Sequence, residues 1–204
     1  TPTSLDMLVK SLGSYAGRDK AVRSLAFISV LQAVSNNPPS KEWAGLAKQL
    51  STARLVFRQL NHPGMIKASV ALQRQAPADD VERYCAYTVT GVYTVYGVVE
   101  LAAWLSEAGI LAGDSVRLFR YCLYMWLIAL FAGTIRQIRV LSRKAEWSVE
   151  KVKDDVLLLA SYVCDFISGV NSLPPGMLWS GKLQTKTTAK FSLIASLIGF
   201  YRTL

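Results

Sequence analysis

Few residues in this sequence have types and spacings that suit catalysis. The one histidine, His62, stands before Pro63 in an expected turn without a neighbouring carboxylate or cysteine, so we interpret it as a loop histidine. The residues Gly113-Asp114-Ser115-Val116 superficially match the nucleophile block of some esterases, but they precede a long apolar stretch, where Asp114 or Ser115 is better explained as a helix N-cap. Phosphate-loop and dinucleotide-binding patterns are absent. We therefore expect no enzyme activity and no cofactor.

The three cysteines also lack the spacing of a functional site. Cys85, Cys122 and Cys164 are odd in number, far apart and placed in apolar surroundings. This pattern favours reduced thiols over a disulfide framework or a CxxC metal site. We expect no metal ion and a reducing compartment.

The overall composition points to a membrane-associated domain. The 204 residues are enough for one domain, 51% are hydrophobic and only 18% are charged, and the mean hydropathy is +0.27. These values exclude a disordered chain. The first 20 residues have no apolar block of the length found in secretory signals, so we expect no secretory targeting.

The excess positive charge is concentrated in the first third of the chain. The formal net charge is +9, and residues 1–75 carry ten Lys or Arg side chains against three Asp or Glu. Such a segment favours a polyanionic partner, either nucleic acid or anionic lipid. Because its basic residues alternate with Leu, Val, Phe and Trp at helical spacing, we predict that the partner is an anionic phospholipid membrane and not nucleic acid.

Residues 43–60 have the clearest amphipathic pattern. Their apolar residues share one broad arc of a helix, and two arginines lie within or at the edge of that arc, where long side chains can reach a membrane boundary. Packing of the same arc in a protein core is an equally good explanation. We expect the helix to end at Asn61-His62-Pro63-Gly64. The residues predicted to contact lipid are Trp43, Leu46, Lys48, Leu50, Arg54, Phe57, Arg58 and Leu60.

Apolar stretches later in the chain are candidates for membrane insertion. Residues 121–135 carry no charge but would span only ~22 Å of a ~30 Å hydrocarbon core, so insertion requires extension to about 116–140 with arginines at both ends. Residues 156–170 and 191–201 are weaker candidates. Residues 88–99 are rich in β-branched and aromatic types, but we predict a helix because a lone strand would have no partner.

The sequence therefore predicts an all-α, membrane-associated helical bundle with an amphipathic N-terminal region and one or two short hydrophobic membrane helices. We expect a single domain, 1–204. It begins with a basic amphipathic helical region at 1–75, which opens with two short helices or one kinked at Gly13 and Gly17. Helices follow at 79–110, 114–144 and 146–171. A Leu-Pro-Pro-Gly turn and a C-terminal apolar helix make up 173–204.

Three motifs in the same order resemble one family. They are Gly17-Arg18-Asp19-Lys20, the segment LSTARLVFR at 50–58, and the segment LPPGMLWSGKL at 173–183, which contains Pro174, Pro175, Gly176, Trp179, Gly181 and Lys182. Together they are similar to the peroxin eleven family of peroxisomal membrane proteins, most of all to its gamma branch.

The resemblance implies a function without a catalytic centre. It implies a peroxisomal membrane protein that remodels the membrane, promotes peroxisome elongation, proliferation and fission, associates with itself and related members, and recruits fission adaptors, with both termini in the cytosol. The family's membrane-deforming helix maps onto Trp43–Leu60. Two alternatives stay open: a pore for small solutes, suggested by Glu100 and Asp165 in apolar helices, and a helical adaptor that does not itself remodel lipid.

Overall fold

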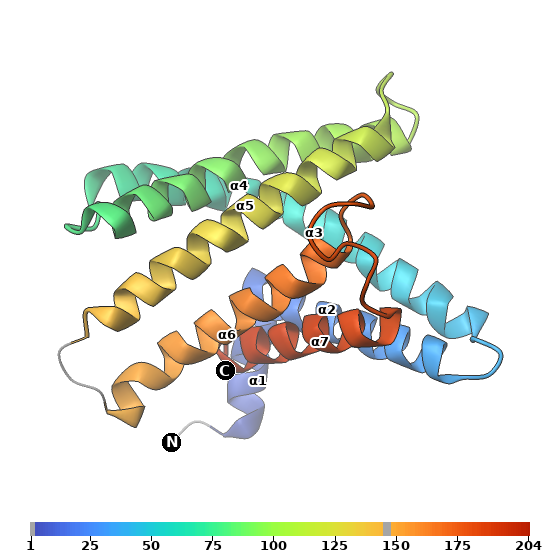
Figure 1. Cartoon of the computed structure of the whole chain (residues 1–204), viewed down its shortest axis with the longest axis horizontal. Helices are drawn as coiled ribbons and strands as arrows, with labels where there is room; N and C mark the ends of the chain where they lie inside the picture. The colour runs from blue at the N-terminus through green and yellow to red at the C-terminus, as the bar shows by residue number, and fades with distance from the viewer. Residues whose placement is uncertain (1–2, 145–147) are drawn as a thin grey trace. The chain divides into compact units, whose positions relative to one another are not determined.

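The computed structural model describes residues 3–144 and 148–204, and these residues form seven helices and no strand (Figure 1). The predicted all-α fold is confirmed. Residues 146 and 147 of the predicted helix 146–171 lie outside the described residues.

The chain divides into two compact units. The first contains the residues up to Phe57 together with Val156–Leu204, and the second contains Arg58–Asp155. The boundaries fall inside helices α3 (Lys41–Arg74) and α6 (Val149–Asn171), so each of these helices contributes to both units.

The first unit begins with two separate helices, α1 (Ser4–Gly13) and α2 (Tyr15–Ser35). Thr3 caps α1 in a capping box, because its hydroxyl accepts from the Asp6 amide and the Asp6 carboxylate accepts from the Thr3 amide. Ser14 caps α2 through the Gly17 amide. Of the two alternatives for this region the separate helices are correct, but the break is at Ser14 and α2 is not short.

Small side chains form the seam between α2 and α7 (Thr185–Tyr201). Ala26, Ser29 and Ala33 of α2 are buried, and so are Ala189, Ser192, Ala195 and Ser196 of α7. Residues of this size let two helix backbones approach closely. Helix α6 joins the same unit through hydroxyl contacts, since Ser168 Oγ lies 2.5 Å from Ser192 Oγ. The core of this unit is therefore built from small and hydroxyl-bearing side chains.

The segment between α6 and α7 is an ordered loop held to the end of α6. The Trp179 indole donates to the Ile167 carbonyl at 3.0 Å, and its ring packs edge-to-face on Phe166. Gly176 and Gly181 both have positive φ angles, which a residue without a Cβ adopts at no steric cost. The glycines of the third motif thus serve the shape of this loop.

The second unit is built on an antiparallel hairpin of α4 (Asp80–Glu107) and α5 (Ser115–Ser142). Asp79 caps α4 and Asp114 caps α5, each accepting from the amide three residues later, at 3.0 Å. The N-cap explanation of the Gly113–Val116 segment is therefore confirmed at Asp114. Residues 88–99 are helical within α4, as predicted.

The predicted end of the amphipathic helix near Pro63 is wrong, because α3 continues through it to Arg74. An internal proline costs about 3 kcal/mol in a helix, since it removes a backbone hydrogen bond and crowds the preceding turn. Contacts with α4 on both sides of Pro63 offset this cost. His62 Nε2 lies 2.9 Å from the Thr94 carbonyl oxygen, and Ser69 Oγ lies 3.0 Å from Thr94 Oγ1. Gly97 permits the approach, because a Cβ there would lie 2.2 Å from the His62 ring.

Candidate membrane-contact site

The first two turns of α3 expose two large apolar side chains on one side of the helix and a lysine on another. Trp43 and Leu46 are 40% and 41% exposed, and Lys48 is exposed as well. Ala47, in the same segment, is buried. The structure therefore leaves a small exposed apolar surface at the start of the predicted lipid-contacting helix.

The remaining predicted apolar contacts have different surroundings. Leu50 and Phe57 are half-buried within the first unit, whereas Leu60, in the second unit, is 78% exposed. Leu55, which the predicted arc did not include, is buried. Trp43, Leu46 and Leu60 are thus the large apolar residues of the predicted set that solvent or lipid can reach most freely.

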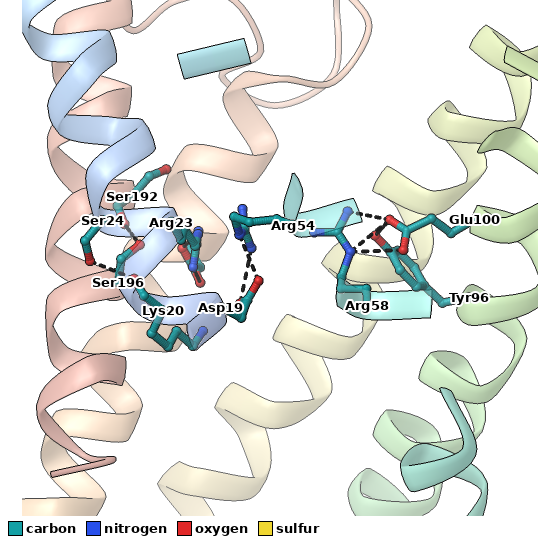
Figure 2. A network of polar contacts seen from close by, with 11 residues as sticks. Asp19, Lys20, Arg23, Ser24, Arg54, Arg58, Tyr96, Glu100, Ser192 and Ser196 are labelled. Atoms are coloured by element: carbon teal, nitrogen blue, oxygen red, sulfur yellow. Dashed lines mark hydrogen bonds and ion pairs between the residues drawn. The ribbon is translucent and has the colours of Figure 1, made fainter. Parts of the chain in front are cut away.

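Both arginines of the predicted set have carboxylate partners within their own units (Figure 2). The Arg54 side chain donates from Nε to Asp19 Oδ1 at 2.8 Å. The Arg58 guanidinium donates to both oxygens of Glu100, from Nε at 2.9 Å to Oε2 and from Nη2 at 2.6 Å to Oε1. Their charges are already compensated by the chain, whereas Lys48 is exposed but lies on the opposite side of α3 from Trp43 and Leu46.

The residues of the Gly17–Lys20 motif pack against several helices of the first unit. A Cβ on Gly17 would lie 2.1 Å from the Ser11 carbonyl oxygen, so only glycine lets α1 and α2 meet here. Asp19 holds Arg54, and the methylene groups of Lys20 lie over Gly199 of α7. Arg18 donates to the carbonyl oxygens at the end of α1, at 3.2 Å to Gly13. Each residue of the motif therefore has a structural role.

A buried ion pair stands one helical turn beyond the motif. Arg23 donates through both terminal nitrogens to the carboxylate of Asp165 on α6, at 2.8 Å to Oδ2, and both side chains are less than a tenth exposed. Burial, together with the neighbouring Arg23 charge, lowers the pKa of Lys20. A bidentate pair of this kind compensates two charges that would otherwise be expensive to bury.

Helices α4 and α5 are each long and apolar enough to cross a membrane. Each has 28 residues, or ~42 Å at 1.5 Å per residue, against a ~30 Å hydrocarbon core. The best 18-residue windows have mean hydropathies of 1.2 in α4 and 1.6 in α5, and most side chains in both windows are not buried in the protein. The α5 segment was expected from the sequence, whereas α4 was considered only as a helix or a strand.

Charged residues gather where α4 begins and α5 ends. Asp79 accepts from Arg139 at 2.9 Å and also pairs with Arg143, and Arg136 pairs with Glu82. Hydrogen bonds from Arg139 and from the Glu82 amide hold the pKa of Asp79 well below its usual range. This end of the hairpin is therefore cationic and fixed by ion pairs. The 108–114 connection at the other end contains no cation, but Arg117 and Arg120 follow in the first two turns of α5.

The side chains that could serve catalysis or line a pore either contact other residues of the chain or lack catalytic neighbours. His62 contacts α4, and burial raises the pKa of the Cys164 thiol, which disfavours its reactive thiolate. Glu100 and Asp165, the carboxylates considered for a solute pathway, each belong to an ion pair. Among residues 3–144 and 148–204, no three His, Cys, Asp or Glu side chains are grouped as metal ligands.

Comparisons with known proteins agree with the motifs. The family model Peroxisomal biogenesis factor 11 (PEX11) matches residues 5–204. Peroxisomal membrane protein 11C of Homo sapiens is 23% identical, over 98% of this chain and 94% of that protein. Peroxisomal membrane protein 11C of Mus musculus is 20% identical, over 95% and 92%. No solved structure matches the chain.

Proposed function

We propose that this chain, which belongs to the Peroxisomal biogenesis factor 11 (PEX11) family, elongates the peroxisomal membrane and prepares it for fission by inserting the start of α3 into one leaflet. Its family and relatives make it a peroxisomal membrane protein involved in peroxisome biogenesis. The observation that carries the proposal is the exposure of Trp43 and Leu46 on one side of the start of α3.

Shallow insertion of these side chains would expand the outer monolayer relative to the inner one. An indole ring favours the interfacial region of a bilayer, and a lysine near an anionic leaflet contributes about 1 kcal/mol. A single protein displaces little lipid, so curvature requires many copies held together. Self-association, with copies of this chain or with related members, is therefore part of the proposal, as is recruitment of fission adaptors to the elongated membrane.

The hairpin of α4 and α5 would attach the protein to the membrane. Because such a hairpin crosses the membrane twice, the chain before α4 and the chain after α5 lie on the same side of the membrane. Cations near membrane spans favour the cytosolic face, and the end where α4 begins carries Arg136, Arg139 and Arg143, against Arg117 and Arg120 at the other end. This arrangement supports cytosolic termini.

The test is tubulation of liposomes that contain the purified full chain and anionic phospholipid. The Trp43→Glu/Leu46→Glu variant is expected to leave the liposomes round, as in protein-free controls, because two carboxylates would replace the inserted groups. Electron microscopy of tubule number and length provides the measurement. Both positions are exposed, which makes them cleaner targets than the half-buried Leu50 and Phe57.

The matched control is Ser51→Glu/Thr52→Glu, which adds the same two charges at exposed positions of α3 outside the predicted arc. It should tubulate as well as the wild type. Equal tubulation by the Trp43→Glu/Leu46→Glu variant would contradict the proposal. Solute release without any change in liposome shape would instead favour the pore alternative.

A further inference from the structure

Helix α7 presents a continuous outward stripe that changes from cationic to apolar. Lys186 and Lys190 are followed on the same side by Ile194, Leu197 and Tyr201, at spacings of three or four residues, and all five are exposed. The opposite side of α7 is the small-residue seam buried against α2. The helix cannot rotate to bury the apolar part of the stripe without breaking that seam.

Helix α1 carries a second exposed apolar stripe in the same unit. Leu5, Leu8, Val9 and Leu12 follow the i, i+3, i+4, i+7 pattern of one helix face, and all four are exposed. The buried Ser11 hydroxyl lies 2.6 Å from Thr203 Oγ1, directly after α7, and the Ser11 carbonyl lies against Gly17. These contacts fix the end of α1 beside the end of α7.

The charges around the two stripes indicate what covers them. Lys10, Arg18, Lys186, Lys190 and Arg202 are exposed cations, whereas α7 contains no acidic residue. The one acidic residue of α1, Asp6, is committed to the capping box. A basic rim around an apolar face matches the anionic headgroups and acyl chains of a phospholipid surface.

The dimensions of α7 favour a helix lying in the interface over a spanning one. Its 17 residues correspond to ~26 Å, shorter than the ~30 Å hydrocarbon core. Its buried side contains Ser192 and Ser196, which bond within the first unit. A spanning α7 would have to leave α2 and expose these hydroxyls to hydrocarbon.

We propose that the α1–α7 face, defined by the exposed stripes of the two helices, is a second lipid-contact surface that lies flat on an anionic leaflet and holds the first unit against the membrane. It is separate from the start of α3 and goes beyond the proposed function, because it requires attachment to a membrane but not remodelling. The candidate spans α4 and α5 keep the same chain at a bilayer, so the face meets lipid without diffusing to it.

Depth-dependent quenching tests this surface in the full chain. Cys85, Cys122 and Cys164 are replaced by alanine, and one new cysteine at Val9 or Leu197 carries the environment-sensitive dye NBD. Proteoliposomes contain phosphatidylcholine with about a third phosphatidylserine, and lipids with a doxyl quencher at acyl carbon 5 or 12. A label at Gln32, exposed on α2, is the matched control.

At both Val9 and Leu197 we expect quenching by the carbon-5 lipid to be at least twofold stronger than by the carbon-12 lipid, and at least twofold stronger than at Gln32. Omission of phosphatidylserine should reduce it at least twofold. Stronger quenching by the carbon-12 lipid at Leu197 would overturn the proposal in favour of a spanning helix. A blue-shifted but unquenched label would overturn it in favour of a second copy or another protein.

Any variant whose chromatographic elution or absorbance spectrum differs from that of the wild type is replaced by a variant labelled at Leu5 or Ile194, which lie on the same two stripes. Tubulation is recorded on the same proteoliposomes. Quenching without tubulation would support this surface while the proposed function failed, and tubulation without quenching would do the reverse.

Discussion

Replacement of Asp165 by alanine is expected to destabilise the first unit by about 3–5 kcal/mol, because it leaves the Arg23 guanidinium buried without its partner. That loss is a large fraction of the 5–15 kcal/mol that stabilises a typical domain. The variant should therefore unfold at a much lower temperature, or at a lower concentration of a denaturing detergent, than the wild type. Circular dichroism of the full chain in mild detergent measures the unfolding.

Two further variants separate the charge from the packing. Arg23→Met/Asp165→Leu replaces the pair by apolar side chains and should recover most of the lost stability. Arg117→Ala removes an exposed pair with Asp114 and should change stability by less than about 1 kcal/mol. If Asp165→Ala is no more destabilising than Arg117→Ala, the buried pair does not hold the first unit together.

Replacement of Glu100 by alanine is the second large effect that we expect, and it acts on the second unit. The carboxylate is 2% exposed and accepts from Arg58, Gln59 and the Tyr96 hydroxyl. Removing it deletes the acceptor of these hydrogen bonds and the buried ion pair with Arg58, which costs about 3–5 kcal/mol. Protease cleavage within α3, near Arg58, should accelerate because this half of the helix loses its charged attachment to α4 and keeps only the contacts of His62 and Ser69.

The same residue separates a structural role from a solute pathway. Arg58→Leu/Glu100→Leu should restore protease resistance, since an apolar pair needs no charge compensation. A structural role predicts that Glu100→Gln leaves the conductance of reconstituted bilayers unchanged. A conductance that is present in the wild type and disappears in Glu100→Gln would show that the carboxylate lines a pore.

Local sequence signals predicted the helix boundaries that depend on neighbouring residues. Asp79 and Asp114 are carboxylates placed before helical runs, and both are N-caps because the cap hydrogen bond is made three residues away. The turn after Ser35 and the start of α3 at Lys41 follow in the same way from Pro38 and Pro39. These features require no knowledge of the tertiary structure.

Features that depend on distant contacts could not be predicted from spacing. The expected break at Pro63 failed because Thr94 of α4, 32 residues after His62 and 25 residues after Ser69, contacts both sides of the proline. The partners of Arg54 and Arg58, which were expected to face lipid, are 35 and 42 residues away. Helix α4 was missed as a candidate span because its Thr, Tyr and Gly residues reduce its hydropathy, although its long uncharged run was visible.

Peroxisome shape in living cells tests the central claim most directly. Cells with a peroxisomal marker express the tagged wild-type chain or the Trp43→Glu/Leu46→Glu variant, and peroxisome length and number are measured by light microscopy. The wild type should coincide with the marker and elongate or multiply the organelles. The variant should reach the same organelles and leave them unchanged. A wild type that leaves peroxisomes unaltered, or a variant that elongates them equally, would contradict insertion of α3 as the cause of remodelling.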